Sequence, residues 1–154
     1  MYVIDTSVVS ALHRNYYRSR FVTLWKLFDE MVASGGFTST REALRELEDH
    51  GGGAYDWAQR NPALFSIPGA KEGAFVAKIY SVPHFQANME KQKLLRGGRN
   101  ADPFLIARAA MTSSTMLTME QLKTNAAKIP NICQHFGVPC MDLEGFMEKE
   151  GWTF

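Results

Sequence analysis

The chain has 154 residues and 45% hydrophobic content, enough for one packed core, so we expect a single domain over residues 1–154. The net charge of only +1 excludes nucleic-acid binding through the field of the whole molecule and leaves only a local basic patch. Only two cysteines are present, which excludes a disulfide-rich protein. We find no secretion signal and no apolar run near the roughly 18 residues that a membrane span needs, so we expect a cytoplasmic protein and not a membrane protein.

Short apolar runs alternate with helical patterns in the N-terminal part of the chain. Tyr2-Val3-Ile4 is rich in β-forming residues, and Asp5-Thr6-Ser7 follows it, which predicts a strand, a turn and a capped helix through Leu12. Ser39 and Glu42 have capping-box spacing, which predicts another helix start. The remaining patterns predict helices over 21–32, 39–49, 55–59 and 73–80, extended segments at 37–38 and 64–67, and a break at 50–53.

The C-terminal part continues the alternation after a polar interruption. Residues 86–101 are polar and basic and contain Gly97-Gly98, which predicts a flexible loop. Asp102-Pro103 has the N-cap and first-turn residues of a helix. We further expect a strand at 115–118, a turn at Pro130, a helix at 131–136, a strand at 140–143 and a helix from 144. The alternation predicts an α/β fold of three layers, α/β/α, with a mostly parallel sheet of four to five strands.

Four acidic residues are predicted at one edge of this sheet. Asp5 ends the first strand, Asp102 begins a helix and Glu120 follows a late strand, while Glu46 lies on the helix after the second strand. Such carboxylates repel one another unless a cation neutralises them, and a hard ion such as Mg²⁺ or Mn²⁺ prefers their oxygen atoms. Such an ion can activate water for attack on a phosphodiester. The pattern indicates metal-assisted phosphodiester hydrolysis.

Each acidic residue also has a purely structural interpretation. Asp5 and Asp102 suit N-cap positions, and Glu120 suits a solvated loop. Glu42 and Glu46 lie on the same predicted helix and are alternative candidates for its metal-binding acid. A capping box explains Glu42 without chemistry, whereas Glu46 flanks the apolar face, so Glu46 is our choice and Glu42 the alternative.

Four segments, in order and spacing, carry a family resemblance: Tyr2-Val3-Ile4-Asp5-Thr6-Ser7, the stretch from Ser39 to Leu47, the stretch from Ala101 to Ala107, and Leu117-Thr118-Met119-Glu120. They resemble the acidic motifs of the PIN-domain family, especially VapC-type ribonuclease toxins, over residues 1–143, although the fourth family motif more often ends in Asp. Residues 128–138 resemble one poorly characterised PIN subfamily.

The resemblance implies a PIN-like fold and a Mg²⁺- or Mn²⁺-dependent endoribonuclease. In that family the acidic positions, here Asp5, Glu46, Asp102 and Glu120, hold the metal and carry catalysis. The resemblance also implies a homodimer and a cognate antitoxin protein as inhibitor. Thr6 or Ser7 would assist the site by hydrogen bonding.

Basic residues beside these motifs are the predicted contacts for RNA phosphates. Four precede Asp102 in the polar stretch and two lie on the helix after the second strand: Lys91, Lys93, Arg96, Arg99, Arg41 and Arg45. Taken singly, each also fits a solvated surface residue.

The sequence gives less support to zinc binding, to nucleophilic catalysis by Ser or Cys and to nucleotide binding by a Walker A loop. Cys133, His135 and Cys140 lack a fourth partner for zinc, and no histidine accompanies a recognisable nucleophile motif. No Walker A glycine loop is present. The main alternative to a nuclease is a PIN-like domain that binds RNA or protein without catalysis.

Overall fold

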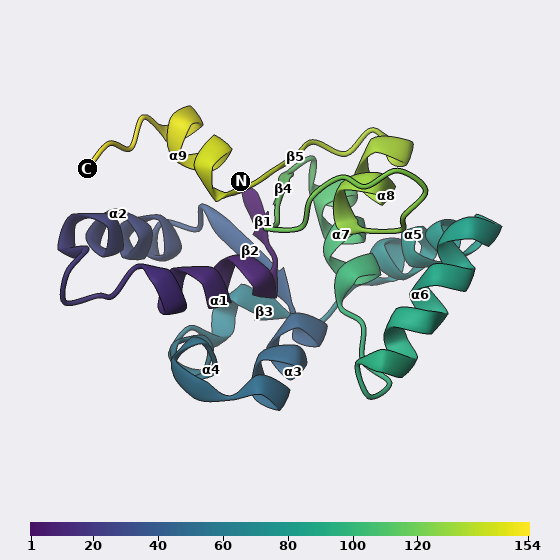
Figure 1. The fold of residues 1–154 in the computed structure, drawn as a ribbon, viewed down its shortest axis with the longest axis horizontal. Coiled ribbons are helices and arrows are strands. Elements are labelled where there is room, and N and C mark those ends of the chain that lie inside the picture. The colour runs from purple at the N-terminus through teal and green to yellow at the C-terminus, as the bar shows by residue number, and fades with distance from the viewer.

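Five short parallel strands form one sheet in the computed structural model, which describes all 154 residues (Figure 1). Neighbouring strands are parallel in every pair, and β1 lies at the centre of the sheet. In sheet order the strands are β3 (Phe65–Ser66), β2 (Phe37–Thr40), β1 (Tyr2–Ile4), β4 (Thr115–Leu117) and β5 (Cys140–Met141). The predicted α/β class with a parallel sheet of four to five strands is confirmed.

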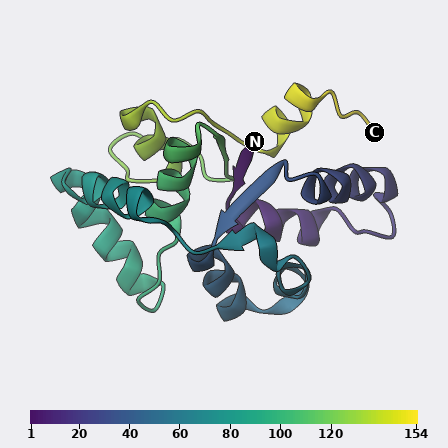
Figure 2. The same ribbon diagram turned by 180° about the vertical axis from the view of Figure 1, so that it is seen from behind.

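Helices flank the sheet on both sides (Figures 1 and 2). One side carries α1 (Thr6–Asn15), α2 (Val22–Ala33), α4 (Gly52–Arg60) and α9 (Leu143–Glu150). The other side carries α5 (Ala70–Tyr80), α6 (Pro83–Leu95), α7 (Asp102–Thr112) and α8 (Ile129–Phe136). Helix α3 (Arg41–His50) lies at the lower edge in Figure 1, and a 3₁₀ turn, Pro62–Leu64, precedes β3. None of these helices combines the length and apolar character required to cross a bilayer.

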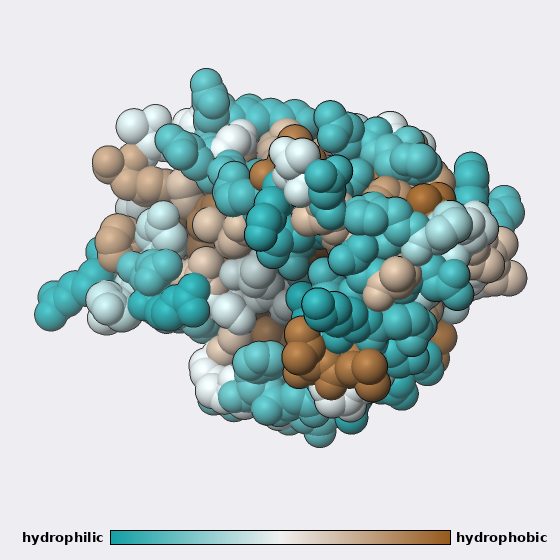
Figure 3. Space-filling model, turned by 45° about the vertical axis from the view of Figure 1, so that its right-hand side comes forward, coloured by the Kyte–Doolittle hydropathy of each residue, from teal (hydrophilic) through white to brown (hydrophobic).

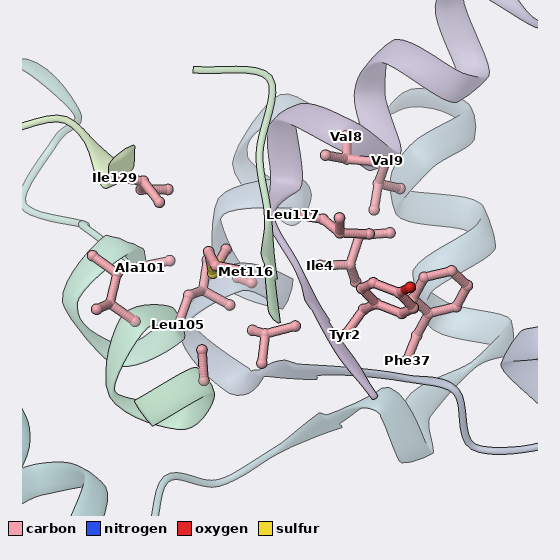
Figure 4. Packing of buried hydrophobic residues seen from close by; sticks show 14 of the residues in the cluster. Tyr2, Ile4, Val8, Val9, Phe37, Ala101, Leu105, Met116, Leu117 and Ile129 are labelled. Atoms are coloured by element: carbon pink, nitrogen blue, oxygen red, sulfur yellow. The ribbon is translucent and has the colours of Figure 1, made fainter. Parts of the chain in front are cut away.

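The central strands are buried on both faces, which explains their continuous apolar sequences. Tyr2 and Ile4 point toward the side of Val8, whereas Met116 of β4 points toward Leu105 on α7 (Figure 4). Ile4 and Met116 are almost fully shielded from solvent. The ends of β1 and β4 are therefore held firmly from both sides.

The order in which strands are added to the sheet reverses at the central strand, β1. From β1 the chain proceeds outward to β2 and then β3, and it afterwards returns to place β4 on the other side of β1. In parallel α/β sheets, such a switch point opens a crevice at the carboxyl ends of the strands. Asp5 follows β1 directly and Thr118 follows β4, so both lie at this crevice.

The predicted flexible loop over residues 86–101 is wrong. Helix α6 extends to Leu95, and only the last six residues of that stretch connect it to α7. The helix buries only Phe85 and Met89, four residues apart, so its apolar stripe is too narrow to stand out, while its exposed residues are good helix formers. Figure 3 turns this side of the molecule forward and shows mostly hydrophilic side chains around one compact apolar cluster.

The predicted capping box at Ser39 and Glu42 is also wrong. Thr40 is the N-cap of α3, and its hydroxyl accepts a hydrogen bond from the Ala43 backbone nitrogen at 3.4 Å. Ser39 belongs to β2, and its hydroxyl donates to the Ile4 carbonyl oxygen at 3.0 Å. Strand pairing thus extends further than the two-residue strand predicted at 37–38.

Neither Asp5 nor Asp102 caps a helix through its side chain. Asp5 occupies the N-cap position of α1 without a capping hydrogen bond, and Asp102 is the first residue of α7, behind Ala101 at the N-cap. Both carboxylates are therefore free for other contacts. The predicted turn at Pro130 is wrong, because Pro130 lies in the first turn of α8, where a proline is tolerated. The remaining predicted elements differ from the structure only at their ends, such as the earlier starts of α4, α5 and α9.

A buried arginine joins the C-terminal helix layer to the sheet. Arg108 of α7 is 5% exposed and donates to both carboxylate oxygens of Glu72 on α5, at 2.6 and 3.1 Å. The same guanidinium donates to the Thr38 hydroxyl at 3.2 Å and to the backbone carbonyl oxygens of Ser39 and Ser66. One side chain thereby ties α5 and α7 to β2 and β3. Nothing in the local sequence pattern distinguished this arginine from a surface residue.

Replacing Arg108 by alanine should destabilise the fold by about 3–5 kcal/mol, because Glu72 is left charged and buried without its partner. Urea unfolding followed by circular dichroism measures this change. The matched control is Arg14→Ala, which removes an exposed arginine from α1. A change in the Arg108 variant no larger than that of the control would contradict the proposed role of this ion pair.

Candidate active site

The four predicted acidic residues line one cavity of about 420 Å³ at the carboxyl edge of the sheet. They reach it from the end of β1, from α3, from the start of α7 and from the loop after β4. Its remaining lining residues are Thr6, Ser7, Asp49, His50, Leu95, Arg96 and Arg99. The structure therefore brings together Asp5, Glu46, Asp102 and Glu120, which are separated by up to 115 residues along the chain.

Hydroxyl groups fix the orientation of the Asp5 carboxylate. Its Oδ2 accepts hydrogen bonds from the hydroxyls of Ser7 at 2.5 Å and Thr118 at 2.9 Å. Its Oδ1 receives only a long contact of 3.4 Å from Thr6. Asp5 is 3% exposed, so its negative charge is held in a largely shielded position with one oxygen lightly engaged.

Glu46, and not Glu42, reaches this cavity from α3. Its Oε1 accepts from the Ala101 backbone nitrogen at 2.7 Å, and its Oε2 accepts from the Thr6 hydroxyl at 3.2 Å. Burial raises the pKa of Glu46, and the Asp5 charge raises it further, while the Ala101 hydrogen bond and a nearby arginine partly oppose the shift. Glu42 lines a neighbouring cavity.

Asp102 is the most strongly perturbed acid of the group. Burial raises its pKa well above the ordinary value for aspartate, and repulsion from Asp5 and Glu120 adds to the shift. Its Oδ1 lies 3.3 Å from Arg96 Nη1, whereas its Oδ2 is buried and has no hydrogen-bond partner. A buried carboxylate oxygen without a partner is costly, so this atom is suited to a ligand that the polypeptide itself does not supply.

Glu120 is held by the start of α8. Its Oε2 accepts from the Ile129 backbone nitrogen at 2.8 Å, and its own backbone nitrogen donates to the Thr118 hydroxyl at 3.1 Å. Its side chain is only 17% exposed, so the interpretation as a solvated loop residue is wrong. Thr118 contacts both Asp5 and Glu120 and thereby couples two of the acids.

Arg96 lies in the exposed segment after α6, within the predicted basic stretch, but its guanidinium extends among the acids. Its guanidinium nitrogens are 3.8 Å from Glu46, 3.3 Å from Asp102 and 3.6 Å from Glu120. Burial lowers the pKa of Arg96, but the three carboxylate charges outweigh this effect and raise it. No group of three or more His, Cys, Asp or Glu side chains is arranged to hold a metal ion, and the guanidinium lies in their midst instead.

Four of the other predicted RNA contacts line the neighbouring cavity, which has a volume of about 520 Å³. They are Arg41, Arg45, Lys93 and Arg99, and Arg99 lines both cavities. Lys91 is exposed on α6 and lines neither cavity. Most of the predicted basic patch therefore adjoins the acidic cavity.

Sequence reasoning missed Asp49, His50 and Leu95 of the cavity lining, and also two residues that position the acids, Thr118 and Asn100. Thr118 lies inside the fourth motif but was taken only as part of a strand. Asn100 is 8% exposed, and its Oδ1 accepts from Arg96 Nη1 at 3.1 Å and from the Asp102 backbone nitrogen at 3.2 Å. Its position two residues before Asp102 was the only available signal.

The residues of the weaker zinc alternative do not converge. Cys133 is buried beside Cys140, and both thiols are free of a disulfide. His135 is exposed, and its ring packs against the rings of Phe85 and Phe136 at centroid distances of 5.2 and 4.7 Å.

The chemistry of the acidic cavity fits a hard divalent cation. Its donors are carboxylate and hydroxyl oxygens, the ligand types that Mg²⁺ and Mn²⁺ prefer over softer metals. The unpartnered Oδ2 of Asp102 and the lightly engaged Oδ1 of Asp5 are free to accept such an ion. Oxygens of Glu46 and Glu120 are already used by backbone nitrogens, although each carboxylate has further lone pairs.

A family profile described as "Domain of unknown function (DUF4411)" matches residues 2–154 of the chain. Among curated proteins and solved structures, the comparisons found no match.

Neutralising Asp102 should stabilise the metal-free protein, and the gain should grow with pH. Because burial and neighbouring charges raise the folded-state pKa of Asp102, the folded protein binds this proton more tightly than the unfolded chain. The contribution of Asp102 to the stability of the parent therefore decreases as pH rises from the unfolded pKa through the folded pKa, and Asp102→Asn avoids this decrease. Urea unfolding in EDTA at pH 4.5 and pH 7.5 measures the difference.

Asp56→Asn is the control for this experiment, because Asp56 is exposed on α4 and forms no ion pair. An Asp102→Asn variant that is less stable than the parent at pH 7.5 would contradict the electrostatic description of the cavity.

Proposed function

This chain belongs to the DUF4411 family, a domain family of unknown function, and we propose that it is a metal-dependent endoribonuclease of the PIN type. The observation that carries the proposal is the convergence of Asp5, Glu46, Asp102 and Glu120 in one cavity at the switch point of a parallel sheet. A second support is the buried Oδ2 of Asp102, which has no partner within the polypeptide.

The four acids would hold Mg²⁺ or Mn²⁺ from the strand and helix ends. When bound, the ion supplies the positive charge that activates water and stabilises the negative charge developing on the phosphate oxygens. Thr6, Ser7 and Thr118 orient the carboxylates through their hydroxyl groups. Removal of such an orienting group in metal sites typically lowers affinity or activity by about 10- to 100-fold.

Arg96 would act as the internal counterion of the metal-free protein. Its guanidinium lies 3.3 to 3.8 Å from three of the carboxylates and offsets only part of their negative charge, so an ion entering the cavity would compete with it. Arg96 lies directly after α6, in the segment that leads to α7, and a displacement there leaves the sheet untouched. Once displaced, the guanidinium would be close enough to the cavity to contact a substrate phosphate.

Arg41, Arg45, Lys93 and Arg99 would bind further phosphates of single-stranded RNA beside the scissile bond. Lys91, which is exposed on α6, would add only to the surrounding field. The choice of RNA over DNA rests on the resemblance of the four motifs to VapC-type ribonuclease toxins. The same resemblance leads us to propose a cytoplasmic toxin that forms a homodimer and is inhibited by a cognate antitoxin protein.

Asp5→Asn should lower RNA cleavage by more than about 100-fold, since loss of a direct ligand exceeds the usual effect of an outer hydrogen-bond partner. A fluorescent single-stranded RNA panel with Mn²⁺ or EDTA, beside a matching DNA panel, measures the rates. Glu46→Gln should behave in the same way, and the matched control Glu48→Gln, exposed on the same helix, should keep the parent rate. Full activity of the folded Asp5→Asn protein, or of the parent in EDTA, would refute the mechanism.

A second candidate is a PIN-like module that binds RNA or protein without cutting. One observation favours it: Arg96 already satisfies much of the acidic charge, and no ready-made metal cage is formed. In that case Arg96 would be a permanent part of the fold.

Titration with Mn²⁺ separates the two candidates without an activity assay. If the acids bind the ion, Mn²⁺ should raise the unfolding midpoint of the parent, with a stabilisation of about 2.7 kcal/mol at 100 times the dissociation constant. Arg96→Gln should unfold more easily in EDTA and gain more from Mn²⁺, because the competing guanidinium is gone. If Mn²⁺ moves neither midpoint, the non-catalytic module is favoured.

A further inference from the structure

The neighbouring cavity, which Arg41, Arg45, Lys93 and Arg99 line, also has aromatic residues and buried polar atoms that phosphate binding alone does not require. It is about 520 Å³ in volume, which is within the usual range for small-molecule pockets. It opens between α3 and the segment that connects α6 to α7, two parts of the chain that face each other at the lower edge of Figure 1. Two of its lining residues, Tyr80 and Phe104, are aromatic.

Two polar atoms in the lining are buried and have no partner. The Oε1 of Glu42 accepts from the Arg41 guanidinium at 2.9 Å, which leaves its Oε2 without a hydrogen bond. The Oδ1 of Asn100 is used by Arg96 and by the Asp102 backbone nitrogen, and these two donors fix the orientation of the amide. Its Nδ2 is therefore the unpartnered donor. Both atoms are shielded from solvent in the wall of the cavity, which therefore contains one carboxylate acceptor and one amide donor without a partner.

The charge of the cavity points to an anionic ligand with a polar, flat head group. Arg45 and Lys93 line it without an ion-pair partner, whereas Arg99 is paired with Asp49 and Arg41 with Glu42, both at 2.9 Å. The four basic residues of the lining outnumber its two acids, Glu42 and Glu90. An unpaired RNA base suits the remaining features, because bases stack on aromatic rings and present donors and acceptors on one edge. The Glu42 carboxylate needs hydrogen-bond donors, and the Watson–Crick edge of guanine has two N–H groups. The carbonyl oxygen on the same edge can accept from the Asn100 amide.

We propose that this cavity binds an unpaired guanine of the RNA, next to the phosphate in the acidic cavity, with Glu42 and Asn100 contacting its Watson–Crick edge. Phe104 and Tyr80 pack against the base, and the basic residues hold its phosphate. Arg99 lines both cavities, and Asn100 contacts Asp102, so the base lies immediately beside the metal-binding acids. The identity of RNA as the ligand rests on the proposed nuclease function.

Binding of the four ribonucleoside 5′-monophosphates to the full chain in EDTA tests this proposal without requiring cleavage. Isothermal titration calorimetry should show GMP binding at least about tenfold more tightly than AMP, CMP or UMP. Glu42→Gln should remove this preference, because the amide replaces a charged acceptor. Arg45→Ala should weaken all four nucleotides to a similar extent, since it removes only a phosphate contact. Glu48→Gln is the matched control for α3 and should bind as the parent does.

Equal binding of all four nucleotides, or a GMP preference that survives in Glu42→Gln, would overturn the proposal, as would the absence of any binding. Parallel cleavage of RNAs that differ only at one unpaired base separates this failure from that of the proposed function. Metal-dependent cleavage without a base preference would leave the nuclease standing and overturn the guanine site. GMP preference without cleavage would support the site while refuting the nuclease.

Discussion

The repulsion between carboxylates gathered at the end of two buried strands is the constraint on which the rest of this site depends. Asp5 and Asp102 are almost fully shielded from solvent, and Glu46 is nearly so. The sheet holds these groups together regardless of their charge, because β1 is packed on both faces and paired with β2 and β4. The repulsion raises the pKa values of Glu46 and Asp102, and Arg96 relieves it in part by placing a positive charge beside Glu46, Asp102 and Glu120.

The acids and their counterion are held differently. Hydroxyl groups and backbone nitrogens anchor Asp5, Glu46 and Glu120 to strand and helix ends. Arg96 extends from the short connection between α6 and α7, with a side chain that is 37% exposed. A fixed acidic frame with a partly exposed counterion supports the proposal that a cation binds here. Asn100 connects the acidic cavity to the neighbouring cavity, since its side chain accepts a hydrogen bond from Arg96 and also lines that neighbouring cavity.

Much of the fold could be predicted because its strands are short apolar runs followed directly by polar residues, as at Ile4 and Asp5. The acidic positions followed from the rule that parallel strands end at one edge. The position of Arg96 could not be predicted, since it depends on where α6 ends, and the narrow apolar stripe of that helix resembled a polar loop. The buried Arg108 was missed for a related reason: its partners lie 36 to 70 residues away, and local patterns carry no such information.

Anomalous diffraction from crystals of the full chain soaked in Mn²⁺ tests the central claim most directly. We expect an anomalous peak at coordination distance from oxygens of Asp5 and Asp102, with Arg96 moved out of the cavity. A cavity in which Arg96 keeps its three ion pairs at saturating Mn²⁺, with no peak among the carboxylates, would contradict the account.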